Sequence, residues 1–138
     1  MHAIFKNILA FIVGIIVGGA VNMGIIMVGS SIIPPPAGVD LMDVEALKAN
    51  MHLFEPQHFI IPFLAHAIGT LLGALLTATI AATYQTKLAL GIGLFFLAGG
   101  IANLIMLPAP IWFAIVDIVG AYLPMGWLGS RIASSWIG

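Results

Sequence analysis

The sequence contains no cysteine and very little charge. The absence of cysteine excludes disulfide bonds, thiolate metal ligands and a cysteine nucleophile. Only 7% of the 138 residues are charged, whereas an average soluble domain carries about 25%. Four basic residues and a formal net charge of −1 also provide no positive surface for a phosphate backbone. We therefore expect neither a soluble enzyme nor a nucleic-acid partner.

Long hydrophobic runs take the place of charge. Hydrophobic residues make up 62% of the sequence, and the mean hydropathy is +1.18. A helix needs about 20 apolar residues to cross a bilayer. Four segments meet this requirement: residues 5–33, 59–82, 88–107 and 111–132. We therefore predict an all-α integral membrane protein, a single domain over residues 1–138, with four transmembrane helices in an antiparallel bundle surrounded by lipid.

The connection between the first two predicted spans, residues 34–58, is the longest one. Asp40 is interpreted as a helix N-cap in this connection. Apolar residues then recur at near-helical spacing, at Leu41, Val44, Leu47 and Met51. This pattern predicts a short amphipathic helix that lies on the outer membrane surface.

The distribution of basic residues predicts the orientation. Lys6, Lys87 and Arg131 all fall on one side of the predicted bundle. The other side carries one lysine against four acidic residues, a net charge of −3, from Lys48, Asp40, Asp43, Glu45 and Glu55. The positive-inside rule then places both termini in the cytoplasm. For a bacterial protein we expect the inner membrane, with the acidic first loop in the periplasm.

Glycine pairs indicate where the helices pack. Gly14 and Gly18 form one GxxxG motif, and Gly69 and Gly73 form another. Helices in lipid associate through close backbone approach and through interhelical hydrogen bonds. We therefore predict that the small and polar residues share the contact faces at the bundle axis.

Four polar residues are the candidate site. His66 and Asp117 are ionisable groups within predicted spans, where such groups are costly and suggest function. Asn103 falls near the same depth, and Asn22 falls deeper. We expect the four side chains to converge as a ligand or proton site, because a carboxylate and an imidazole can pass a proton or hold a charged ligand. The alternative is a structural cluster that fixes helix register, and for the two asparagines we favour this role.

A second cluster lies in the first outer loop. His52, Glu55 and His58 are residue types that bind zinc. Their spacing matches none of the strong zinc motifs. A zinc ion is therefore the one cofactor considered, and a solvated loop with ordinary charges is the favoured interpretation.

The sequence also suggests an internal repeat. The pentapeptide 18–22, GGAVN, resembles the pentapeptide 99–103, GGIAN. Parallel repeats of this kind occur in transporters. The alternative is coincidence in a glycine-rich apolar sequence.

Three functions remain open. The first, which we prefer because of the intramembrane His/Asp pair and the proposed repeat, is a transporter-like protein with an outward-facing site for a small polar solute or a proton. Since four helices enclose little volume, a homo-oligomer is expected. The second is a non-catalytic subunit of a larger membrane complex with partner membrane subunits. The third is a membrane enzyme that acts on a lipid or a quinone.

Overall fold

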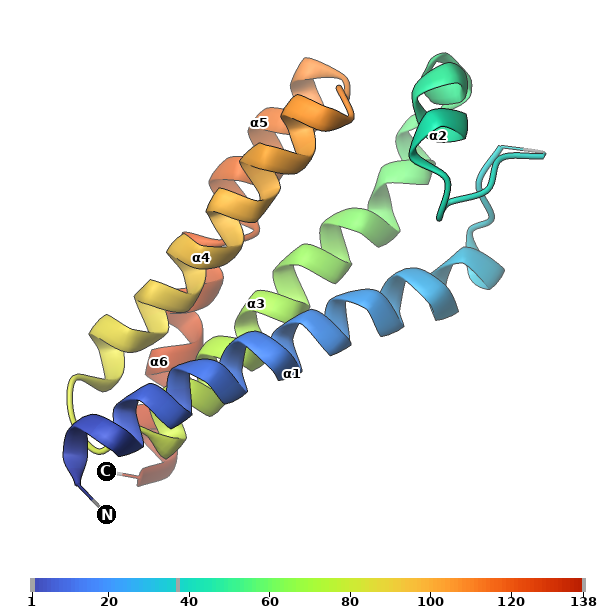
Figure 1. Ribbon diagram of the computed structural model, residues 1–138. Helices are drawn as coiled ribbons and strands as arrows, with labels where there is room; N and C mark the ends of the chain where they lie inside the picture. The colour runs from blue at the N-terminus through green and yellow to red at the C-terminus, as the bar shows by residue number, and fades with distance from the viewer. Residues whose placement is uncertain (1, 37, 138) are drawn as a thin grey trace.

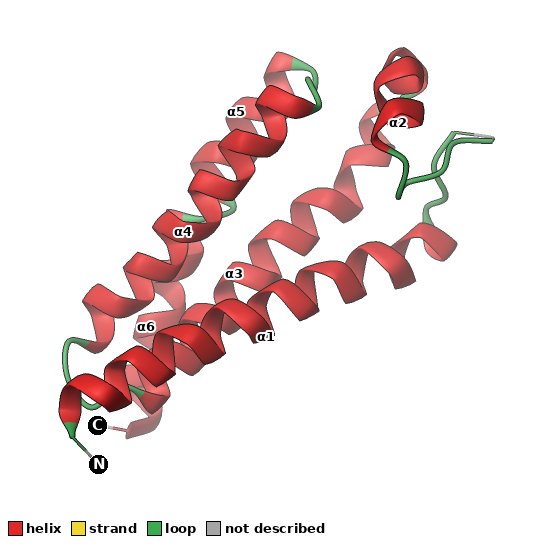
Figure 2. Ribbon diagram, viewed as in Figure 1, coloured by secondary structure: helices red, strands yellow, loops and turns green. Residues whose placement is uncertain are grey.

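The computed structural model describes residues 2–36 and 38–137, and their regular elements are all helices (Figure 1 and Figure 2). The α-helices are α1 (Ala3–Ile32), α2 (Val44–Asn50), α3 (Ile60–Ile80), α4 (Gln85–Met106), α5 (Ile111–Gly120) and α6 (Leu123–Ile137). Two short 3-10 helices, η1 (Met51–Leu53) and η2 (Pro56–Phe59), precede α3. The predicted all-α class is confirmed.

Four helical segments are long and apolar enough to cross a membrane. They are Ala3–Ile32, Pro56–Ile80, Gln85–Met106 and Ile111–Ile137. The four predicted apolar segments are therefore helical, and their ends differ by a few residues from the prediction. The largest differences are at Pro56 and Gln85, where the second and third segments each begin three residues before the predicted start, and at Ile137, where the fourth ends five residues beyond the predicted end.

Figure 1 shows the path of the chain. α1 leads away from the end where both termini lie, α3 returns to it, α4 leads away again, and α5 and α6 return. We name the end with both termini the terminal end and the opposite end, which holds residues 33–59, the loop end. α1 and α4 diverge toward the loop end (Figure 1).

The two predicted glycine motifs pack against each other between α1 and α3. A Cβ atom at Gly14 would lie 2.7 Å from the carbonyl oxygen of Gly73, and one at Gly18 would lie 2.8 Å from the carbonyl oxygen of Gly69. Only glycine permits this approach of the two backbones. The hydroxyl of Thr77 adds an interhelical hydrogen bond of 3.1 Å to the carbonyl of Ala10. Close backbone approach therefore holds α1 on α3, as expected for helices in lipid.

The turn between α3 and α4 is fastened by a side chain of α1. The Asn7 side-chain oxygen accepts hydrogen bonds from the backbone N–H groups of Ala82 (2.9 Å) and Thr83 (3.2 Å). Its amide group donates to the Thr83 hydroxyl at 2.8 Å. These bonds give partners to two backbone N–H groups in the turn between α3 and α4.

The fourth segment is two helices and not the single continuous span 111–132 that was predicted. α5 ends at Gly120 and α6 begins at Leu123. Pro124 explains the break, because its ring nitrogen has no hydrogen to donate to the carbonyl of Gly120, four residues earlier, and the ring clashes with that carbonyl. The chain therefore changes direction at Ala121 and Tyr122, in the middle of the segment.

The loop-end helix α2 begins later than the sequence predicts. Its N-cap is Asp43, whose carboxylate accepts hydrogen bonds from the N–H groups of Glu45 (3.0 Å) and Ala46 (3.2 Å). The prediction of Asp40 as the cap is wrong. Asp40 instead accepts a hydrogen bond of 2.9 Å from the Met42 N–H in the preceding turn.

Candidate functional site

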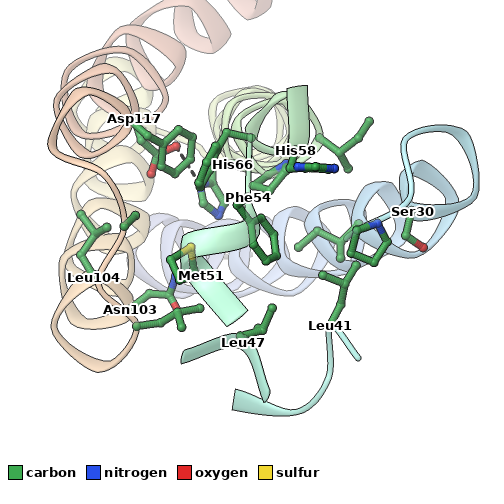
Figure 3. A pocket seen from close by; sticks show the side chains of 18 of the residues that line it. Ser30, Leu41, Leu47, Met51, Phe54, His58, His66, Asn103, Leu104 and Asp117 are labelled. Carbon is green, nitrogen blue, oxygen red and sulfur yellow. Dashed lines mark hydrogen bonds and ion pairs between the residues drawn. The ribbon is translucent and has the colours of Figure 1, made fainter. Parts of the chain in front are cut away.

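A cavity of about 230 Å³ lies at the loop end, between α1, α3, α4 and α5 (Figure 3). The segment between α1 and α3 forms one of its walls. The residues that line it include Ile26 and Ser30 of α1, Leu41, Leu47, Met51, Phe54, His58 and Phe59 of the loop end, His66 of α3, Asn103 and Leu104 of α4, Leu107 at the C-cap of α4, and Phe113 and Asp117 of α5. The cavity is therefore lined by residues of α1, α3, α4 and α5 and by residues of the loop end.

His66 and Asp117 meet at the cavity. The Nδ1 atom of His66 lies 2.8 Å from the Oδ1 atom of Asp117. The Asp117 side chain is 2% exposed, whereas that of His66 is 19% exposed. The carboxylate is thus enclosed by protein, and the imidazole is the part of the pair that a ligand can reach.

A third residue, Tyr122, completes the pair and was not predicted from the sequence. Its hydroxyl donates a hydrogen bond of 3.1 Å to the Oδ2 atom of Asp117. Its ring also stacks on the His66 ring, with centroids 5.8 Å apart. Gly100 of α4 makes room for this ring, because a Cβ atom there would overlap the Tyr122 hydroxyl. The signal in the sequence was Pro124, whose helix break lets the ring turn back toward Asp117.

The hydrogen bonds define what the pair offers to a ligand. The Tyr122 hydroxyl donates to one oxygen of Asp117, and the other oxygen shares a hydrogen bond with the Nδ1 atom of His66. When Asp117 is the acceptor in this bond, Nδ1 carries the hydrogen, and the opposite nitrogen, Nε2, is left for the cavity. The His66 ring reaches from α3 toward Asp117 and into this space (Figure 3). The pair can therefore take up one proton or accept one hydrogen bond from a ligand.

The two asparagines lie in different places. Asn103 lines the cavity, with its helix face exposed. Asn22 does not line it, and packs against α3 instead, where a Cβ atom at Gly69 would lie 3.1 Å from the Asn22 Cβ. The Asn22 side-chain oxygen is buried without a hydrogen-bond partner among the described residues. The structure thus brings together three of the four predicted residues.

The loop cluster His52, Glu55 and His58 does not assemble as a group. Within residues 2–36 and 38–137, no three His, Asp or Glu side chains are placed to hold a metal ion. The Nδ1 atom of His58 accepts a hydrogen bond of 2.8 Å from the Glu55 backbone N–H, which stabilises the start of η2. His52 and Glu55 are exposed. The zinc site stays a prediction.

The proposed repeat aligns residues that pack differently. Gly18 is buried against α3, whereas the aligned Gly99 has open space around it. The neighbouring pair is reversed, since Gly19 faces open space and Gly100 is buried against Tyr122. The contact face of α4 therefore includes Gly100 and not Gly99. The duplication itself stays a prediction.

No protein-family model, curated protein or solved structure gives a significant match to this chain. A fold alone does not define a function, so the functional argument depends on the chemistry of the site.

Proposed function

We propose that this chain is a small transporter-like protein of the bacterial inner membrane. Its cavity is the outward-facing site for a small polar solute or a proton. The observation that carries the proposal is the His66–Asp117 hydrogen bond of 2.8 Å beside a cavity, within helices apolar enough to span a bilayer. A buried carboxylate at this depth is costly. A binding or proton-transfer role accounts for that cost.

The proposed topology is an antiparallel bundle with both termini in the cytoplasm. Lys6 lies in the first turn of α1, Lys87 in the first turn of α4 and Arg131 in the second half of α6. The start of α1, the start of α4 and the end of α6 all lie at the terminal end (Figure 1), which supports a cytoplasmic position for that end. The loop end, with its net charge of −3, is then periplasmic. In this orientation the cavity opens toward the periplasm and α2 lies at the outer membrane surface.

We further propose that the protein acts as a homo-oligomer or together with partner membrane subunits. Asn103 supports this, because it is exposed although it lines the cavity, so the single chain does not enclose the cavity at this residue. A polar side chain in lipid is stabilised when a neighbouring helix offers a hydrogen-bond partner.

Flux through reconstituted protein tests the transport proposal. Proteoliposomes that contain pyranine report proton entry, and light scattering reports entry of glycerol, urea or tetramethylammonium chloride. We expect the wild-type chain to conduct at least one of these above empty liposomes. The substitution Asp117→Asn should lower that flux by at least about tenfold, because removing a buried charge partner is worth more than 1.4 kcal/mol.

Asp40→Asn is the matched control. It removes the same charge by the same substitution from an exposed loop position that does not line the cavity. We expect wild-type flux from this variant. Wild-type flux from Asp117→Asn, in protein that elutes and melts like the wild type, would contradict the proposed function.

The aromatic walls of the cavity favour a second function, an enzyme that acts on a lipid or a quinone. Phe54, Phe59 and Phe113 all line the cavity. For this function His66 would be the general base. A lipid or quinone that is retained by the purified wild type and lost from Asp117→Asn, in a protein that supports no flux, would favour the enzyme.

A further inference from the structure

The cavity has mostly apolar walls and a few polar residues. The rings of Phe54 and Phe59 lie 5.8 Å apart, and those of Phe59 and Phe113 lie 4.7 Å apart. Met51 and Leu104 extend this apolar lining. The polar lining residues are Ser30, His58, Asn103 and the His66–Asp117 pair. A ligand that fills the cavity therefore needs an apolar body and a polar group that reaches the His66–Asp117 pair, as in most small-molecule sites.

The net charge around the cavity is negative. The Asp117 carboxylate is the one acidic group in the lining, and the lining contains no lysine or arginine. The lining also holds two histidines, His58 and His66, and a proton on either one cancels the charge of that carboxylate. The loop end outside the cavity is also acidic, and its one lysine, Lys48, lies 4.0 Å from the Glu45 carboxylate. The negative electrostatic potential of these groups concentrates cations and repels anions.

From these two observations we propose that the cavity binds a monovalent organic cation with an apolar body. The positive charge lies beside His66 and Asp117, and the apolar part lies against Phe59 and Phe113, whose ring faces also attract cations. A bound cation and a proton on His66 each balance the same carboxylate, so the two occupy the site in turn. This inference rests on the proposed function, because it names the solute class of that site.

Three bromine-labelled probes of similar size and shape test the charge preference. They are (4-bromobenzyl)trimethylammonium, its uncharged carbon analogue 1-bromo-4-neopentylbenzene, and the anion (4-bromophenyl)methanesulfonate. Bromine quenches tryptophan fluorescence at short range, and Trp112 contacts the cavity rings Phe59 and Phe113, at 5.5 and 5.9 Å between centroids. Trp127→Phe and Trp136→Phe, both at exposed positions, leave Trp112 as the single reporter.

We expect saturable quenching by the cation, with a dissociation constant at least about tenfold below that of the uncharged analogue, the scale of a desolvated cation–aromatic contact combined with a charge pair. The sulfonate should give no saturable quenching. Asp117→Asn should reduce the preference for the cation to below about twofold, since its neutral side chain leaves no charge to balance. Asp40→Asn, which removes one of the four acidic groups of the loop end outside the cavity, should reduce the preference much less than Asp117→Asn does.

A second variant keeps the test decisive where Asp117→Asn does not fold. Leu104→Lys places a positive charge in the cavity lining and leaves His66 and Asp117 in place. It should abolish quenching by the cation and permit saturable quenching by the sulfonate. Cation binding to Leu104→Lys at the wild-type dissociation constant would overturn the inference.

The outcomes separate the inference from the proposed function. Equal binding of the cation and the uncharged analogue, tighter binding of the sulfonate, or no saturable quenching by any probe overturns the cation preference. The proposed function survives each of these results if flux still depends on Asp117. Wild-type flux from folded Asp117→Asn overturns the proposed function, whichever probe binds.

Discussion

Asp117 shows at the residue scale how a buried charge is stabilised within an apolar helix. Its two oxygens receive hydrogen bonds from His66 and Tyr122, which lie on different elements of the chain. An unpaired buried acceptor costs more free energy than its hydrogen bond contributes when it is formed. Each of the two donors is therefore expected to stabilise the fold as well as the site.

The substitution Tyr122→Phe tests the second donor. It keeps the ring that packs on His66 and removes the hydroxyl that reaches Asp117. Because one buried oxygen then has no partner, we expect the free energy of unfolding to fall by about 1–3 kcal/mol. Denaturant titration of the purified protein measures this change.

Tyr84→Phe is the control for Tyr122→Phe. Tyr84 is 65% exposed and lies in the turn before α4, at the terminal end. We expect no measurable change in unfolding from this variant. Equal losses from the two substitutions would show that the Tyr122 hydroxyl does not stabilise Asp117.

Glycine packing at the element scale gives a prediction with an internal control. The substitution Gly18→Ala places a methyl group 2.8 Å from the carbonyl oxygen of Gly69 and 2.9 Å from the ring of Phe96. α1 must then move away from α3, and overpacking of this kind costs about 1–3 kcal/mol. We expect a lower thermal unfolding midpoint in detergent.

Gly19→Ala is chemically the same change on the next residue of α1. A Cβ atom at Gly19 would meet no atom within 4 Å. Alanine is also the better helix former, by about 0.5–1 kcal/mol in water. We therefore expect an unchanged or higher midpoint for this variant. A midpoint for Gly18→Ala that equals or exceeds that of Gly19→Ala would contradict the packing between α1 and α3.

The sequence predicts the helices well where one physical effect, the hydropathy of the segment, dominates. Hydropathy alone located the four apolar segments, because a helix satisfies the backbone hydrogen bonds of an apolar segment within the segment itself. The ends were less certain, since capping and turn bonds such as those of Asn7 depend on residues far away in the chain. The glycine motifs marked a contact face on each of the first two spans, and the structure packs these two faces against each other.

The part of the site that the sequence did not predict follows from one helix break. Tyr122 follows Asp117 by five residues, which on a continuous helix places the two about 140° apart. The break at residues 121–122 removes that restriction, and the hydroxyl reaches the carboxylate. Asn22 was predicted to belong to the site because its periodicity matched the polar face of the helix. Its position along α1 keeps it out of the cavity lining.

The natural absence of cysteine makes the orientation of the whole molecule testable. Glu45→Cys, on α2, and Thr86→Cys, at the start of α4, each introduce the single thiol of the chain. Because basic ends remain in the cytoplasm, we expect a membrane-impermeant maleimide to label Glu45→Cys in intact cells. Thr86→Cys should be labelled only after the membrane is permeabilised. The reverse pattern would show that the proposed orientation is wrong.

The division of the fourth segment has a mechanical consequence for the entire bundle. α6 packs extensively on α3 and α4, whereas α5 has few neighbours. Two contacts attach α5 to the second apolar segment: the His66–Asp117 hydrogen bond to α3, and the tilted ring pair of Phe59, at the end of η2, and Phe113. Loss of the hydrogen bond therefore leaves α5 attached to that segment by apolar contacts.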